Sequence, residues 1–86
     1  MSQIDLRIRN VLEGNARLLV AANALNDDSD LYEVGLSSHA SVNVMLACED
    51  EFGVEFPESL LRKSTFQSIG SIRRALESLG IADGAE

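Results

Sequence analysis

The chain has 86 residues, a formal net charge of −7 and a hydrophobic content of 45%. A chain of this length fits one domain with a thin core, which leaves little room for a substrate pocket and a catalytic apparatus. Its acidity disfavours nucleic acid as a partner, because contact with phosphates needs basic surfaces, and its apolar content is too high for a disordered chain.

Residues 4–22 are predicted to form the first helix. Apolar side chains recur there at spacings of three, four and seven, which places them on one helix face: Ile4, Ile8, Val11, Leu12, Leu18, Leu19 and Ala22. Gly14 and Asn15 are poor helix formers, so we expect a local weakness in the middle of this helix.

Residues 23–36 are predicted to form a long loop. Its first half is rich in turn formers, and its second half carries the apolar residues Leu31, Tyr32, Val34 and Leu36, which would anchor it to the core. A loop of this length in a compact domain is usually functional or disordered, and the anchors favour a functional loop.

The second helix is expected to begin near Ser37, which suits the N-cap, and to end near Phe52 and Gly53. The residues in its centre are apolar around most of the helix circumference: Val42, Val44, Met45, Leu46, Ala47 and Cys48. They cannot all point inward, so we expect the leftover apolar groups to form a docking patch for partner enzymes.

Pro57 is placed to open a short helix that runs through Leu61. Ser64 and Gln67 fit a capping box for the last helix, which Gly80 would end. The sequence therefore predicts an all-α fold, a small bundle of three main helices plus one short helix, with a long loop between the first two main helices. We expect one domain over residues 1–80 and a flexible C-terminal tail over residues 81–86.

One segment resembles the acyl and peptidyl carrier protein family. It runs from Asp30 to Pro57 and combines DLYEVGLSS, the helical VNVML, and EDEFGVEFP. The usual motif of that family is Gly-x-Asp-Ser-Leu, in which the serine receives phosphopantetheine from coenzyme A. Residues 35–39, Gly-Leu-Ser-Ser-His, fall on this motif. The resemblance thus implies that Ser38 is the attachment residue.

The resemblance also implies the function and the partners. The chain would hold an acyl or aminoacyl group as a thioester on a covalent 4'-phosphopantetheine arm at Ser38, and would itself be no enzyme. Its partners would be a phosphopantetheinyl transferase, a cargo-loading ligase or transacylase, and downstream enzymes that accept the acyl or aminoacyl group. A serine in the first turn of a helix is accessible, and the backbone N–H groups and dipole of that helix end favour a phosphate.

The chain departs from the family pattern beside Ser38. Ser37 replaces the usual Asp, which keeps a cap but loses a charge, and His39 replaces the usual Leu. We therefore expect a specialised carrier with dedicated partners, and not the general carrier of fatty-acid synthesis. The residues expected to contact partners are Ser37, His39, Val42, Met45, Glu49 and Asp50.

The distribution of charge supports a search for protein partners. Between residues 18 and 61 there are nine acidic residues and no Lys or Arg, so this stretch would attract basic faces of other proteins. Cys48 is the only cysteine, and we expect it to be a small core residue. A lone thiol without a signal-peptide pattern predicts a cytoplasmic protein. The sequence contains no apolar run long enough to predict a membrane span. We also expect a monomer and no metal site.

Three functions remain open on sequence grounds. The cargo is acyl in the first and aminoacyl in the second, and the enzyme that loads the arm distinguishes the two. In the third, the chain is an unmodified helical interaction module that kept the fold and lost the arm. Mass after treatment with coenzyme A and a transferase separates the third from the other two.

Overall fold

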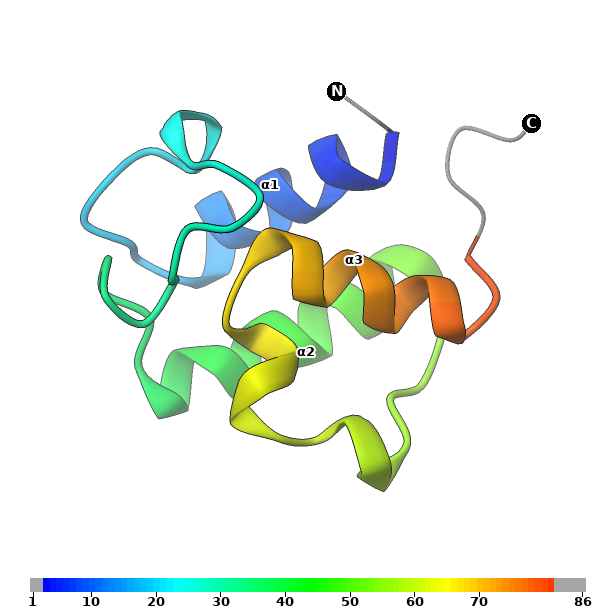
Figure 1. Ribbon diagram of the computed structural model, residues 1–86. Helices are drawn as coiled ribbons and strands as arrows, with labels where there is room; N and C mark the ends of the chain where they lie inside the picture. Colours follow the sequence, from blue (N-terminus) through cyan, green and yellow to red (C-terminus); the bar gives the residue numbers. More distant parts are fainter. Residues whose placement is uncertain (1–2, 82–86) are drawn as a thin grey trace.

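The computed structural model describes residues 3–81, which form three α-helices and three short 3₁₀ turns (Figure 1). The elements in chain order are α1 (Gln3–Asn15), η1 (Ala22–Ala24), α2 (Ser38–Phe52), η2 (Glu58–Leu60), η3 (Lys63–Phe66) and α3 (Ile69–Ser78). No strand occurs within residues 3–81. The predicted all-α bundle with a long loop between the first two main helices is confirmed, and η2 is the predicted short helix.

The first helix is shorter than predicted. α1 ends at Asn15, whose side-chain amide donates to the carbonyl of Val11 at 2.8 Å, and Arg17 adopts a left-handed backbone with φ 55°. The chain therefore leaves the helix at the point where Gly14 and Asn15 weaken it. Leu19 was predicted to lie on the buried face and is instead 81% exposed.

The last helix begins later than predicted. Ser64 lies inside the 3₁₀ turn η3, and the capping box is formed by Ser68 and Ser71 at the start of α3. The Ser68 hydroxyl accepts from the Ser71 backbone at 3.1 Å, and the Ser71 hydroxyl accepts from the Ser68 backbone at 3.0 Å. The prediction that a serine caps this helix is correct, but the predicted start lies one turn too early in the sequence.

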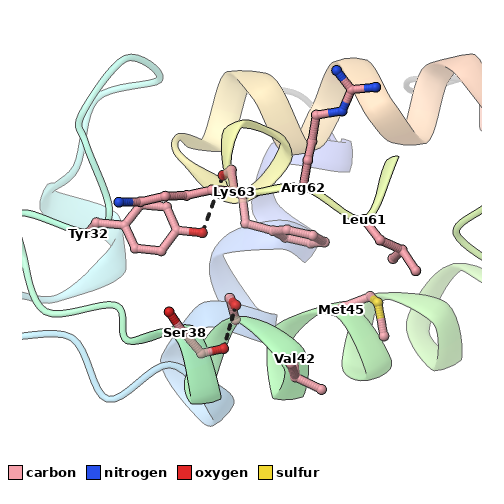
Figure 2. Close-up of a pocket in the computed structure, with 9 residues that line it drawn as sticks. Tyr32, Ser38, Val42, Met45, Leu61, Arg62 and Lys63 are labelled. Atoms are coloured by element: carbon pink, nitrogen blue, oxygen red, sulfur yellow. Dashed lines mark hydrogen bonds between the residues drawn. The ribbon is translucent and has the colours of Figure 1, made fainter. Parts of the chain in front are cut away.

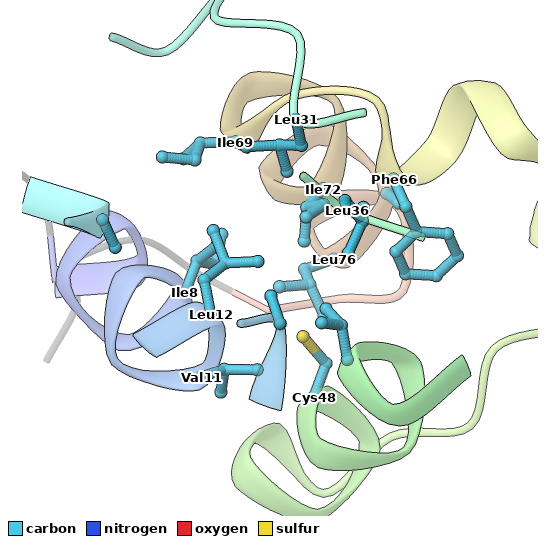
Figure 3. Close-up of a cluster of buried hydrophobic side chains, with 14 of the residues drawn as sticks. Ile8, Val11, Leu12, Leu31, Leu36, Cys48, Phe66, Ile69, Ile72 and Leu76 are labelled. Atoms are coloured by element: carbon cyan, nitrogen blue, oxygen red, sulfur yellow. The ribbon is translucent and has the colours of Figure 1, made fainter. Parts of the chain in front are cut away.

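A single apolar cluster joins the three helices and the long loop (Figure 3). Each helix contributes fully buried side chains, such as Ile8 from α1, Val44 and Cys48 from α2, and Ile72 from α3. The loop before α2 is anchored by Leu31 and Leu36, which are buried as predicted. The site that follows this loop is therefore tied to the core and not carried on a free segment.

No helix within residues 3–81 has the length and apolar character that crossing a bilayer requires. The predicted flexible tail falls almost entirely on residues 82–86, which lie outside the described residues.

Candidate functional site

The N-terminus of α2 is held by a side-chain cap. Ser37 has an extended backbone, and its hydroxyl accepts a hydrogen bond from the backbone N–H of Ala40 at 2.9 Å. The Ser37 carbonyl accepts from the backbone N–H of Ser41, also at 2.9 Å. Ser38 is thus the first residue of the helix, and it is exposed.

The loop that leads to Ser38 is fixed by backbone hydrogen bonds to two other parts of the chain. Leu31 donates to the carbonyl of Gln67 at 2.7 Å, and Leu19 donates to the carbonyl of Val34 at 2.8 Å. Gly35 then turns with φ 114°, and a Cβ there would lie only 3.2 Å from Cγ of Leu19. These contacts give Ser38 a defined position relative to α1 and α3.

A hollow of about 350 Å³ opens beside Ser38 (Figure 2). Its lining is mainly apolar and comes from α2 on one side and from the segment before α3 on the other, with Tyr32 at one end. The lining residues are Tyr32, Ser38, Ser41, Val42, Met45, Leu61, Arg62, Lys63 and Phe66.

Tyr32 and Lys63 close one end of this hollow. The Tyr32 hydroxyl donates to the carbonyl of Lys63 at 3.2 Å, and the Lys63 ammonium lies 4.8 Å from the centre of the Tyr32 ring. Burial raises the pKa of Tyr32 above its ordinary value of 10.0. A tyrosine hydroxyl is protonated at neutral pH even without this shift, so it can donate this hydrogen bond.

The residues expected to contact partners lie along α2, but they do not share one role. Ser37 and His39 are exposed at its start, Val42 and Met45 line the hollow, and Asp50 is exposed near its end. The carboxylate of Glu49 accepts from the backbone N–H of Phe56 at 2.9 Å. Glu49 therefore stabilises the position of the segment after α2, which is a structural role separate from any contact with a partner.

The structure shows which apolar residues of α2 are not buried in the core. Val44 and Cys48 are buried, whereas Val42 is 50% and Leu46 53% exposed. Leu46 follows Val42 by four residues, so both lie on one face of the helix, the face that also carries Ser38. The predicted existence of exposed apolar groups on α2 is confirmed, and Leu46 belongs to them.

Cys48 does not offer a nucleophile. It is fully buried, and this burial, with added repulsion from Glu51 and Glu49, raises the pKa of its thiol to about 12. Within residues 3–81 no three His, Cys, Asp or Glu side chains group as metal ligands would. The chemistry available at this site is thus that of an accessible hydroxyl at a helix N-terminus beside an apolar hollow. That chemistry fits a phosphate-linked arm, because the helix end favours the phosphate and the hollow can cover the apolar part of the arm.

Sequence reasoning missed the far side of the hollow. Leu61, Arg62, Lys63 and Phe66 lie more than twenty positions after Ser38 in the sequence, and only the fold brings them opposite α2. The one available signal was the apolar character of Leu61 next to two basic residues that end the acidic stretch.

Comparisons with known proteins agree with this geometry. Residues 7–76 match the family model described as a phosphopantetheine attachment site. The chain is 40% identical over 83 residues to the "Aminoacyl carrier protein" of Agrobacterium fabrum, covering 96% of this chain and 98% of that protein. It is 36% identical over 67 residues to "Aminoacyl carrier protein 1" of Bradyrhizobium diazoefficiens, covering 78% and 70% of the two chains.

Solved structures with a similar chain include complexes with a ligase. One is an engineered Bradyrhizobium japonicum glycine:[carrier protein] ligase complexed with carrier protein from Agrobacterium tumefaciens and AMP. The similar chain there has a TM-score of 0.83 and 38% identity, over 85% of this chain and 97% of that chain. A second is the B. japonicum ligase complexed with glycylated carrier protein, with a TM-score of 0.71 and 30% identity, over 84% and 96% of the two chains.

Proposed function

This chain belongs to the family of carrier proteins with a phosphopantetheine attachment site, and on that premise we propose that it carries an aminoacyl group as a thioester on an arm joined to Ser38. The arm comes from coenzyme A, and a phosphopantetheinyl transferase attaches it. The chain itself performs no catalysis in this function. It presents the loaded thiol to other enzymes.

The observation that carries the choice of Ser38 is its position. It is an exposed hydroxyl in the first turn of α2, at the mouth of an apolar hollow, and it falls on the serine of the family motif. Ser37 is less suited, because its hydroxyl already serves as the helix cap. Ser41 is also less suited, because its hydroxyl donates to the carbonyl of Ser38 at 2.7 Å.

The choice of an aminoacyl cargo is supported by the relatives. The two relatives described above are named aminoacyl carrier proteins, and one complex contains a carrier that bears glycine. We therefore propose that an amino acid:carrier protein ligase loads this chain with a small amino acid. The exposed Val42 and Leu46 on α2 form its docking patch, together with the partner contacts expected at Ser37, His39, Met45 and Asp50.

The first experiment tests the attachment. Purified apoprotein is incubated with coenzyme A and a phosphopantetheinyl transferase of broad specificity, and its intact mass is measured. We expect the mass to rise by one phosphopantetheine, and we expect Ser38→Ala to abolish the rise. Ser37→Asp is the matched control, because it keeps the cap and leaves Ser38 in place, so it should be modified like the parent. An unchanged mass of the parent protein would overturn the proposal and favour the unmodified interaction module.

The second experiment tests the cargo. The phosphopantetheinylated protein is offered to a glycine:[carrier protein] ligase with ATP and glycine, and separately to a fatty-acyl ligase with ATP and a fatty acid. We expect an aminoacyl mass increase in the first reaction that hydroxylamine removes, because thioesters react with amines. Loading in the second reaction alone would assign an acyl cargo instead. Efficient turnover by generic fatty-acid synthase enzymes would count against a specialised carrier.

The cytoplasmic location and the monomeric state stay predictions from the sequence. Size-exclusion chromatography with light scattering on the phosphopantetheinylated protein tests the second of these.

A further inference from the structure

An exposed leucine lies beside the loop that leads to Ser38. Leu19 is 81% exposed, the highest value for a large apolar side chain among residues 3–81, and the next residue, Val20, is 42% exposed. Their segment and the loop before α2 lie side by side at one end of the molecule (Figure 1). Single apolar residues are common on protein surfaces, but these two are neighbours and lie next to the candidate site. We call Leu19 and Val20 the Leu19 patch.

The Leu19 patch contacts the motif residue Gly35. A Cβ built on Gly35 would lie 3.2 Å from Cγ of Leu19 and 3.3 Å from its backbone nitrogen. Gly35 precedes Ser38 by three residues, and three residues span at most about 11 Å. Cγ of Leu19 therefore lies within roughly 16 Å of Cα of Ser38, and this value is an upper limit.

The Leu19 patch is also held in place on the folded protein. The backbone N–H of Leu19 donates to the carbonyl of Val34 at 2.8 Å, and that of Ala22 donates to the carboxylate of Glu13 at 2.8 Å. Leu18 packs against the apolar core, whereas the side chain of Leu19 extends into solvent. A side chain on a backbone that is already fixed loses less entropy when a partner covers it.

The chemistry of attachment decides which partner must cover this region. Oγ of Ser38 forms a bond to the phosphorus that carries pantetheine in coenzyme A, and the bond from that phosphorus to the leaving adenosine bisphosphate breaks. The proton of the hydroxyl passes to a base of the transferase. The transferase must therefore bring its own active site to Ser38, whereas a ligase reaches the thiol at the far end of the arm.

An enzyme that is centred on Ser38 extends over the Leu19 patch. A protein–protein interface of standard size buries about 800 Å² on each partner, which corresponds to a disc with a radius of about 16 Å. Leu19 lies within this radius. Arg17 and Glu33, both exposed, flank the patch in the sequence and in the adjoining loop with opposite charges. Their charges offset each other, so burial of the apolar side chains is the main source of attraction there.

We propose that Leu19 and Val20 dock in an apolar recess of the phosphopantetheinyl transferase while this enzyme modifies Ser38. This inference rests on the proposed attachment at Ser38. Both residues act as positioning residues, because they bring the hydroxyl to the transferase and take no part in the bond changes. The transferase then uses the Leu19 patch, and the ligase uses the docking patch on α2.

The test measures the kinetics of attachment. The transferase of broad specificity is used at limiting concentration with saturating coenzyme A, the concentration of apoprotein is varied, and the modified fraction is read from intact mass. The variants are Leu19→Ser, Val20→Ser and Leu19→Met, which keeps an apolar side chain. Leu6→Ser is the matched control, because Leu6 is a 49% exposed leucine about 13 Å along the helix axis from Asn15, where α1 ends.

We expect Leu19→Ser to lower kcat/KM for attachment about tenfold, mainly through a higher KM for the apoprotein. Val20→Ser should have a smaller effect in the same direction, and Leu19→Met and Leu6→Ser should behave like the parent. Prolonged incubation should still modify Leu19→Ser completely, because Ser38 is intact. Ligase-catalysed loading of this modified variant should stay within about twofold of the parent.

Thermal unfolding followed by circular dichroism checks that each variant is folded. Leu19→Ser should melt at the parent's temperature, since its side chain is mostly exposed. If its melting temperature falls, Leu19→Gln takes its place, because glutamine keeps most of the side-chain length and is still polar.

Two results would overturn the inference. One is a Leu19→Ser protein that is modified with the parent's kcat/KM, and a loss confined to loading would then assign the patch to the ligase. The other is an equal loss in attachment and loading, which would show a docking surface common to both enzymes. Both results leave the proposed function standing, because the parent still gains mass. A parent protein without any gain in mass would overturn the proposed function and this inference together.

Discussion

The hydroxyl of Ser37 accepts a hydrogen bond from the backbone N–H of Ala40, with 2.9 Å between the two heavy atoms. The first N–H groups of a helix lack partners within the helix, and this hydroxyl satisfies one of them. The contact determines where α2 starts, and so places Ser38 in its first turn with an exposed side chain. A serine in place of the family's aspartate therefore preserves the geometry of the site while it removes one charge.

Loss of this cap should weaken the protein without blocking attachment of the arm. We expect Ser37→Ala to lower the free energy of unfolding by about 1 kcal/mol, and Ser37→Asp to change it by only a few tenths. Urea denaturation followed by circular dichroism measures both. An alanine variant as stable as the parent would show that the cap has no energetic role.

Gly35 should be intolerant of a side chain. Its φ of 114° is rarely adopted by L-residues, and a Cβ would press against Leu19 at 3.2 Å, so we expect Gly35→Ala to cost about 1–2 kcal/mol. Gly14, within α1, is the matched control. Apart from its chain neighbours, no side chain among residues 3–81 would come within 4 Å of a Cβ added there, so Gly14→Ala should stabilise by about 0.5–1 kcal/mol. The midpoint temperature of thermal unfolding should therefore fall for Gly35→Ala and rise for Gly14→Ala, relative to the parent.

The parts of the fold that the sequence predicted are those with local signals. The polar cap at Ser37 and the left-handed Gly53, with φ 66°, define the two ends of α2, and both were recognised. The start of α3 was misplaced because Ser64 and Ser68 both resemble caps. The contact that separates them is tertiary, since the backbone N–H of Gly70 donates to the carbonyl of Asp27 at 3.0 Å.

The residues of the candidate site also differ in whether the sequence alone could predict them. Ser38 could be predicted because its neighbours in sequence carry the family motif. The lining residues Leu61 and Phe66 could not, because nothing in their own sequence neighbourhood indicates that they will lie opposite α2. The exposure of Leu19 could not be predicted from the sequence either, because the apolar repeat continues past Asn15, the residue at which α1 ends.

Arg73 connects α3 to both α1 and the long loop. Its guanidinium lies 2.5 Å from the Asp5 carboxylate and 2.9 Å from that of Asp27. We expect Arg73→Met to lower the free energy of unfolding by about 2 kcal/mol, because it leaves the largely buried Asp5 without this cation. The neighbouring Arg74 is exposed, and Arg74→Met should change stability by less than about 0.5 kcal/mol. Equal stability of the two variants in urea would contradict this role for Arg73.

Burial of Cys48 should make stability depend on alkaline pH. The folded protein raises the pKa of this thiol from 9.0 to about 12, so the unfolded chain loses the proton first. The stabilising effect is complete below pH 9.0 and is lost as the pH rises toward 12, by about 1.4 kcal/mol per pH unit for this one group. Urea denaturation of the apoprotein at several alkaline pH values measures the slope. Cys48→Ala should be less stable at neutral pH but should show a shallower slope, and an unchanged slope would rule out the thiol as its source.

The exposed apolar residues on α2 should matter for loading by the ligase and not for folding. Leu46 is 53% exposed on the face of α2 that carries Ser38, and removal of its side chain from water on docking would supply binding energy. We expect Leu46→Ser to lower kcat/KM for ligase-catalysed loading about tenfold, mainly through a higher KM, which corresponds to about 1.4 kcal/mol. Leu6→Ser is the matched control, because Leu6 is 49% exposed on α1, outside the hollow beside Ser38. Both variants should melt at the parent's temperature, since neither side chain is in the core. If Leu6→Ser impairs loading as much as Leu46→Ser, the ligase does not select the α2 face, and docking must be assigned to another surface.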